Sequence, residues 1–346
     1  MMERSDFLER LMNGLADLTP AEREQVEAYY TEILEDALEG GEDEATVLAG
    51  FGSPEEAARK LLAEYGTPAP GIREEEPADG TWEYTARQRP QEVMVEAQNA
   101  KVTLVPVAGG TARLHYRGFG PEVDTVSCTE VDGLLHFSQQ VHETVLFQLF
   151  RRCPQRRVTV ELPSDFKGVI RVTTQNERIV AEGFKYLQLL DCRTKNAKIE
   201  LADLGAADLR AQTKNAGVEV SRTAADTLLA QASNAALRLK QVTVQKRLEG
   251  ETTNAGIHAD DCAGPAVTLN TTNGALHVSD LLADDIHLQT KNAAIHARIR
   301  GEAQEFSIEA YTSNANSNLV NTRIDSRPKR LRVHTTNGAI DVKFRP

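Results

Sequence analysis

The sequence predicts a mainly β protein, a right-handed parallel β-solenoid (a single-stranded β-helix) preceded by a small all-α bundle. Three observations lead to this prediction. An asparagine recurs every 19–23 residues through the C-terminal half, and apolar residues alternate with polar ones on both sides of it. The first 66 residues instead space their apolar side chains as helices do. A repeat of about 20 residues is typical of solenoids.

Residues 1–66 are predicted to form a bundle of four short helices. One helical face gathers the apolar residues Phe7, Leu8, Leu11, Met12 and Leu15. Capping sequences at residues 19–22 and 53–56 begin two further helices, and a short one is expected around residues 45–48. The segment holds 17 acidic and 5 basic side chains, which accounts for the formal net charge of −12. Its acidic outer face is either simply solvated or docks on a basic partner.

The start of this bundle and two of its turns carry recognisable sequences. They are Asp6-Phe7-Leu8, Leu18-Thr19-Pro20-Ala21-Glu22-Arg23 and Phe51-Gly52-Ser53-Pro54-Glu55-Glu56-Ala57-Ala58. Over residues 1–66 they resemble the HAAS-type helical signalling domain of Gram-positive bacteria. The resemblance implies a protein-docking module linked to PadR-like transcriptional regulators. Membrane helices usually follow such a domain, but no apolar run here reaches the ~20 residues that span a bilayer.

The rest of the chain divides into three parts. Residues 67–80 are Pro-rich and acidic, which predicts a semi-extended linker. Residues 81–169 are expected to hold a first rung around Asn99 and strands that cap the end of the solenoid. Residues 170–346 are expected to form nine rungs with a structural ladder of stacked asparagines. The ladder residues are Asn176, Asn196, Asn215, Asn234, Asn254, Asn273, Asn292, Asn314 and Asn337.

Each rung is expected to have two strands that meet at the asparagine. The sixth residue before the asparagine is always apolar, and the third after it is apolar in all rungs but one. Thr stands two residues before it in eight of the nine rungs. Asparagine tolerates the left-handed conformation of a tight corner. The sequence therefore predicts a buried amide ladder, from which Asn254→Ala would remove about 1–3 kcal/mol of stability.

Three segments are characteristic of this array. They are Val158-Thr159-Val160-Glu161-Leu162-Pro163, Thr271-Thr272-Asn273-Gly274-Ala275-Leu276 and Thr335-Thr336-Asn337-Gly338-Ala339-Ile340. Over about residues 92–346 they resemble the bacterial "putative adhesin" β-strand-repeat family, a domain of unknown function found in cell-envelope stress proteins. The resemblance implies a β-strand-repeat domain, and "adhesin" is there a label more than an activity.

One outward position, four residues after the asparagine, holds histidine in three consecutive rungs. These are His258, His277 and His296, which precede Asn318 and Asp341 in chain order. Two imidazoles one strand spacing apart can bind Zn²⁺ or Ni²⁺. A straight row suits tetrahedral geometry poorly, and the sequence places no carboxylate beside it. Ordinary exposed stacking, without metal or cofactor, is therefore the favoured interpretation.

Two aspartate pairs are candidate catalytic groups. Asp260-Asp261 and Asp284-Asp285 are similar to the paired carboxylates of β-helix polysaccharide hydrolases. One pair follows a second strand and the other precedes a first strand, so they are not expected to share a face. No phosphate-binding loop or Ser/His/Asp spacing occurs. The sequence predicts no catalytic residue.

The favoured function is a non-enzymatic sensor or scaffold related to cell-envelope stress or signalling. In it the solenoid is a binding surface and the acidic bundle docks on a protein partner. An adhesin-like surface-binding protein is the alternative, and a carbohydrate-active β-helix enzyme is a third hypothesis. Residues 67–346 hold 34 acidic and 34 basic side chains, so nucleic acid is not an expected partner. The N-terminus lacks a signal-peptide profile, which favours the cytoplasm and leaves export by a non-classical route open.

The last rung is expected to be the open end of the solenoid, because no further element follows residues 339–346. Lys343, Arg345 and Pro346 are residue types that block pairing at a strand edge, which favours a monomer. The alternative is an end-to-end homodimer through this C-terminal rung.

Overall fold

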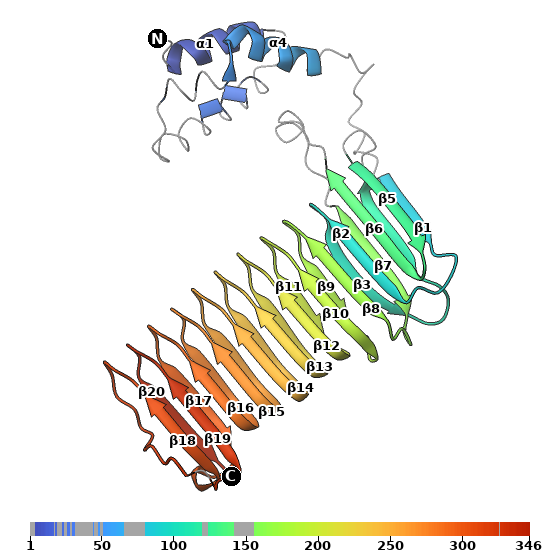
Figure 1. The fold of residues 1–346 in the computed structure, drawn as a ribbon. Helices are drawn as coiled ribbons and strands as arrows, with labels where there is room; N and C mark the ends of the chain where they lie inside the picture. The colour runs from blue at the N-terminus through green and yellow to red at the C-terminus, as the bar shows by residue number, and fades with distance from the viewer. Residues whose placement is uncertain are drawn as a thin grey trace. The chain divides into compact units, whose positions relative to one another are not determined.

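In a computed structural model the chain divides into a helical unit and a β unit (Figure 1). The structure describes residues 80–119, 124–141, 156–324 and 326–346 of the β unit. In the helical unit it describes residues 4–65 except 17, 19–22, 24–25, 28–29, 32–43, 45–47 and 49–50. The predicted linker before residue 80 lies outside the described residues.

The helical unit contains α1 (Arg4–Gly14) and α4 (Pro54–Tyr65), which pack on each other through buried side chains. Phe7 and Leu11 of α1 are buried in one apolar cluster with Ala57 and Ala58 of α4. The Ser53 hydroxyl accepts a hydrogen bond from the Glu56 N–H at 3.2 Å, so the capping sequence predicted for this helix is confirmed. The helices expected from residue 19 and around residues 45–48 fall largely outside the described residues. In the described part of the chain, no helix combines the length and the apolar composition needed to cross a membrane.

The β unit is a parallel β-solenoid, and it makes the chain mainly β. In chain order its strands are β1 (Gly80–Thr85), β2 (Glu92–Ala97), β3 (Lys101–Val107), β4 (Arg113–Phe119), β5 (Asp124–Val131), β6 (Leu134–Val141), β7 (Arg157–Pro163), β8 (Val169–Thr174), β9 (Ile179–Glu182), β10 (Leu187–Arg193), β11 (Ile199–Ala202), β12 (Gly205–Gln212), β13 (Val218–Gln231), β14 (Leu237–Glu251), β15 (Ile257–Asn270), β16 (Leu276–Gln289), β17 (Ile295–Arg300), β18 (Phe306–Tyr311), β19 (Lys329–His334) and β20 (Ile340–Arg345). A short 3-10 helix, η1 (Ala303–Glu305), precedes β18. The handedness of the coil stays a prediction.

Each rung contributes one strand before the asparagine and one after it, and like strands stack in parallel register (Figure 1). Strands β13 to β16 are long because each contains the second strand of one rung and the first strand of the next. The predicted alternation is confirmed, since the inward positions Leu209, Leu237 and Ile286 are fully buried. The core is therefore a column of stacked aliphatic side chains between two sheets.

The left-handed corner of a rung does not lie at the asparagine, which corrects that expectation. Positive φ angles occur seven residues after it, at Asp203, Arg222, Gln241, Asp261 and Asp280, with φ between 47° and 55°. Among the described residues no ladder asparagine has a positive φ. The asparagine turn is a three-residue bend, whereas from Arg222 to Asp280 the other corner lies within a continuous strand. A single residue must then supply the whole change of direction.

The asparagines form one hydrogen-bonded ladder, which includes Asn99 of the rung made by β2 and β3. Each Nδ2 donates to the Oδ1 of the next amide at 2.6–2.9 Å. All nine asparagines of residues 170–346 are exposed, so the prediction of a buried ladder is wrong. Water can replace an exposed amide bond, and its loss costs correspondingly little.

The buried polar residue of the turn is the threonine two positions before the asparagine. Thr213, Thr252, Thr271, Thr290 and Thr335 are all buried. The Thr271 hydroxyl donates to the Ala255 carbonyl of the neighbouring rung at 2.9 Å and accepts from the Gly274 N–H at 3.2 Å. This hydroxyl therefore joins two rungs in a place that water does not reach.

Thr271→Val is expected to destabilise the solenoid by about 1–3 kcal/mol, because it leaves a buried carbonyl and N–H unpaired at nearly constant volume. Asn254→Ala should cost less than about 1 kcal/mol, since its amide lies at the surface. Urea unfolding followed by circular dichroism compares the two variants. A larger loss in Asn254→Ala would contradict this ranking.

The order of the rungs in space differs from the chain order at both ends. At the N-terminal end, β2 pairs with β6 on one side and β8 on the other, and β3 pairs with β7 and β9. At the C-terminal end, β19 lies between β16 and β18. The first and last repeats of the sequence are thus internal, and the repeats next to them in the chain are outermost.

The prediction that residues 339–346 form the open end is therefore wrong. Strand β20 pairs with β17, and Asn318 covers its other edge. The Asn318 amide accepts from the Val342 N–H at 3.0 Å and donates to the Val342 carbonyl at 2.9 Å. The outermost rung consists of β18 and residues 316–322, and a homodimer through the last rung loses its structural basis.

Antiparallel strands close the N-terminal end. Strand β5 pairs with β6, and β4 pairs with β7 and with β1. Beneath them lies a buried ion pair in which Arg156 Nε donates to Asp124 Oδ1 at 3.0 Å. The strand-like segments predicted within residues 111–162 thus have two roles. Strands β6 and β7 form an outer rung that lacks the asparagine, and β4 and β5 belong to the antiparallel cap.

Candidate functional site

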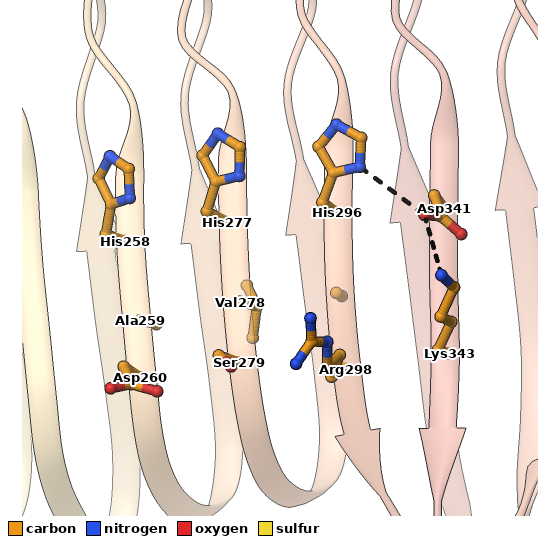
Figure 2. A pocket seen from close by; sticks show the side chains of 11 residues that line it. His258, Ala259, Asp260, His277, Val278, Ser279, His296, Arg298, Asp341 and Lys343 are labelled. Carbon is orange, nitrogen blue, oxygen red and sulfur yellow. Dashed lines mark ion pairs between the residues drawn. The ribbon is translucent and has the colours of Figure 1, made fainter.

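The three candidate histidines lie side by side on strands β15, β16 and β17 (Figure 2). The ring centroids of His258 and His277 are 5.1 Å apart, and those of His277 and His296 are 5.4 Å apart. In both pairs the ring planes differ by 12°, so the rings stack face to face. We call these three residues the histidine row.

The rung order brings a carboxylate to one end of the histidine row. Strand β20 lies beside β17, which places Asp341 opposite His296. The Asp341 Oδ2 and His296 Nδ1 atoms are 3.9 Å apart (Figure 2). The expectation that no carboxylate stands beside the row is therefore wrong, because it assumed that Asn318 would come next. Arg238 lies opposite His258 at the other end.

The histidine row forms one side of a shallow groove of about 370 Å³. Its other side is the outward position two residues further along each strand, held by Asp260, Ser279, Arg298 and Lys343 (Figure 2). The groove thus presents imidazoles along one side and groups of both charges along the other.

The stacked rings do not converge on a common point. The lone pair of an imidazole nitrogen lies in the ring plane, and nearly parallel planes cannot direct two lone pairs at one ion. The part of the chain that the structure describes holds no group of three or more His, Cys, Asp or Glu side chains placed to bind a metal. That the histidine row stacks without binding a metal stays a prediction.

The environment of His258 disfavours its charged form. Partial burial lowers the pKa of this imidazole, and the neighbouring His277 and Arg238 lower it further. On the first-strand face, burial lowers the pKa of His287, with Arg332 and His334 adding to the effect and Asp285 opposing it. In both cases the folded protein holds a proton less tightly than the unfolded chain does.

Acidification is therefore expected to destabilise the solenoid. The contribution of a histidine with a lowered pKa is present above its ordinary value of about 6.5 and is lost as the pH falls through the folded-state pKa. The urea concentration at the unfolding midpoint should decrease as the pH is lowered from about 7 to about 5. His258→Gln and His287→Gln should each reduce the slope of midpoint against pH. An undiminished slope in the double variant would contradict the assignment.

The structure keeps the two aspartate pairs apart. Asp261 and Asp285 form ion pairs with Arg300 and Arg332. Asp260 lies in the groove of the histidine row, on a second strand, whereas Asp285 lies on a first strand. This agrees with the prediction that the pairs do not share a face.

Another outward row, which was not predicted, lies three residues before the ladder asparagine. It holds Gln212, Gln231, Glu251, Asn270 and Gln289 in five consecutive rungs. The sequence does show this row, because an amide or carboxylate side chain stands three residues before the asparagine in each of these five repeats.

Two family descriptions match the chain. HAAS matches residues 6–60, and Toastrack DUF4097 matches residues 91–343. No curated protein matches the chain.

Solved structures of low sequence identity also align with it. A "putative adhesin" from Bacteroides fragilis is 13% identical, covers 80% of this chain and all of its own, and gives a TM-score of 0.41. Those from Parabacteroides merdae and Parabacteroides distasonis are 13% and 10% identical, with TM-scores of 0.39 and 0.41. They cover 77% and 76% of this chain, and 96% of their own chains.

Proposed function

The chain belongs to the Toastrack DUF4097 family, and we propose that it is a non-enzymatic signalling scaffold with the solenoid as its binding surface. In this proposal the HAAS domain docks on a protein partner, and the protein acts in the cytoplasm in the response to cell-envelope stress. The observation that supports it best is the in-register stacking of rungs, which repeats one outward side chain at ~4.8 Å intervals. Such rows offer a ligand many equivalent contacts along one line.

The exposed charge of the helical unit suits a basic partner. Asp6 and Glu9 of α1 and Glu55 and Glu56 of α4 are exposed. Arg10 engages Glu55 at 2.6 Å, which leaves Asp6, Glu9 and Glu56 as the more available carboxylates. We propose a PadR-like transcriptional regulator as the partner.

Affinity capture with the full chain tests the docking role. The double variant Glu9→Lys and Glu56→Lys should lose a partner that the unmodified chain retains, because both changes reverse exposed charges. Asp284→Lys, a charge reversal at an exposed carboxylate of the solenoid, is the control. Equal capture by the chain and both variants would reject docking through the acidic face.

Cell fractionation separates this proposal from the adhesin-like alternative. The scaffold should be recovered with cytoplasmic proteins, and an adhesin with the cell surface.

A further inference from the structure

A second groove of about 580 Å³ runs along the solenoid between first strands and asparagine turns. One side is the row Gln212, Gln231, Glu251, Asn270 and Gln289, which we call the amide row. These five residues are Cα partners in consecutive parallel strands, so they repeat at one strand spacing. The hydroxyl-bearing residues Ser233, Thr253 and Thr272 line the other side.

Hydrogen bonding divides the amide row into two halves. Gln212 Nε2 donates to Gln231 Oε1 at 2.5 Å, and Gln231 Nε2 donates to Glu251 Oε2 at 2.6 Å. These three side chains largely satisfy one another. In the other half, the Asn270 oxygen is buried and has no hydrogen-bond partner among the described residues, and Gln289 is exposed. A buried amide oxygen without a partner is costly, so a hydrogen bond from a ligand in this groove would stabilise it.

The rung order extends this row with aromatic side chains. Because β19 and then β18 follow β16 in space, His334 lies opposite Gln289 and Tyr311 lies opposite His334. The Tyr311 side chain is 56% exposed, and its ring meets that of His334 edge to face with centroids 5.3 Å apart. The exposed Tyr311 ring thus lies in line with the amide row, one rung beyond His334.

We propose that the amide row binds an extended neutral polysaccharide that lies along the solenoid axis. Amides donate and accept at one site, as sugar hydroxyls do, and Glu251 is the only formal charge among the residues lining this groove. Repetition at ~4.8 Å is on the order of the length of one sugar residue, so successive residues of an extended chain can each meet one side chain of the row. The exposed face of Tyr311 suits the apolar face of a terminal ring. This inference rests on the proposed function, since it names a ligand class for the binding surface.

An extended peptide suits the groove less well. Its backbone polar groups recur every ~3.3 Å and its side chains alternate between two faces, so it would lose register with the rungs.

Isothermal titration calorimetry on the full chain tests the proposal. The probes are hexasaccharides of β-1,4-linked glucose, β-1,4-linked N-acetylglucosamine and α-1,4-linked glucose, with a neutral extended peptide as the competing class. At least one hexasaccharide should bind. Asn270→Ala, Gln289→Ala and Tyr311→Ala should each weaken binding by about fivefold to tenfold, as expected for one lost hydrogen bond or stacking contact.

Gln188→Ala is the matched control, an exposed glutamine on a first strand outside the amide row. It should leave affinity unchanged, and circular dichroism establishes that each variant is folded. The proposal is overturned if no hexasaccharide binds, if only the peptide binds, or if the control loses as much affinity as the row variants. Capture of a partner through the helical unit without any glycan binding would overturn this inference alone and leave the scaffold function standing.

Discussion

Replacing Arg156 with methionine is expected to destabilise the N-terminal end of the solenoid by about 3–5 kcal/mol. The Arg156 and Asp124 side chains are 3% and 0% exposed and meet at 3.0 Å. Removing the guanidinium leaves the Asp124 carboxylate buried without its counter-charge. The Gln139 amide donates a hydrogen bond to the same carboxylate at 3.4 Å. This hydrogen bond is too long and too weak to replace the ion pair with Arg156.

A double variant separates the ion pair from packing. Arg156→Met with Asp124→Leu removes both charges, so it should be markedly more stable than Arg156→Met alone. Urea unfolding and hydrogen exchange of β6 and β7 would measure the difference. If the double variant were the less stable of the two, the loss would come from packing and not from an orphaned charge.

Leu331→Ala is expected to cost about 2–5 kcal/mol, and more than Ile308→Ala. Leu331 is fully buried between Ile286 on one side and Ile308 on the other, although it belongs to the last repeat of the chain. Ile308 lies in the outermost rung, where its surroundings can collapse into the space that a shorter side chain leaves.

The comparison tests the rung order directly. If rungs stacked in chain order, Ile308 would be the internal residue and Leu331 the terminal one, and the ranking of the two variants would reverse. Urea unfolding of both variants, with hydrogen exchange of β18 and β19 to locate the loss, decides between the two orders.

Local patterns predicted most of the rung and part of the site. Alternating apolar residues identified the inward positions, because a strand directs successive side chains to opposite faces. The period of the repeat placed His258, His277 and His296 in line. The same reasoning misjudged the burial of the ladder, since a repeated asparagine shows that amides stack but not whether they stack inside or outside. The buried hydrogen bond belongs to Thr271 and its equivalents, whose recurrence was visible and whose role was not.

By itself the sequence determined the solenoid, its two-stranded rung and the rows of outward side chains. Each of these follows from residues within one repeat and from the period that relates repeats. Only the tertiary structure decided which repeats are neighbours at the ends. Any rung can pair with any other of the same register, so the repeat pattern does not distinguish β18 from β19 as the partner of β16. That choice places Asp341 beside His296 and His334 beside Gln289, because both contacts join repeats that are not consecutive in the chain.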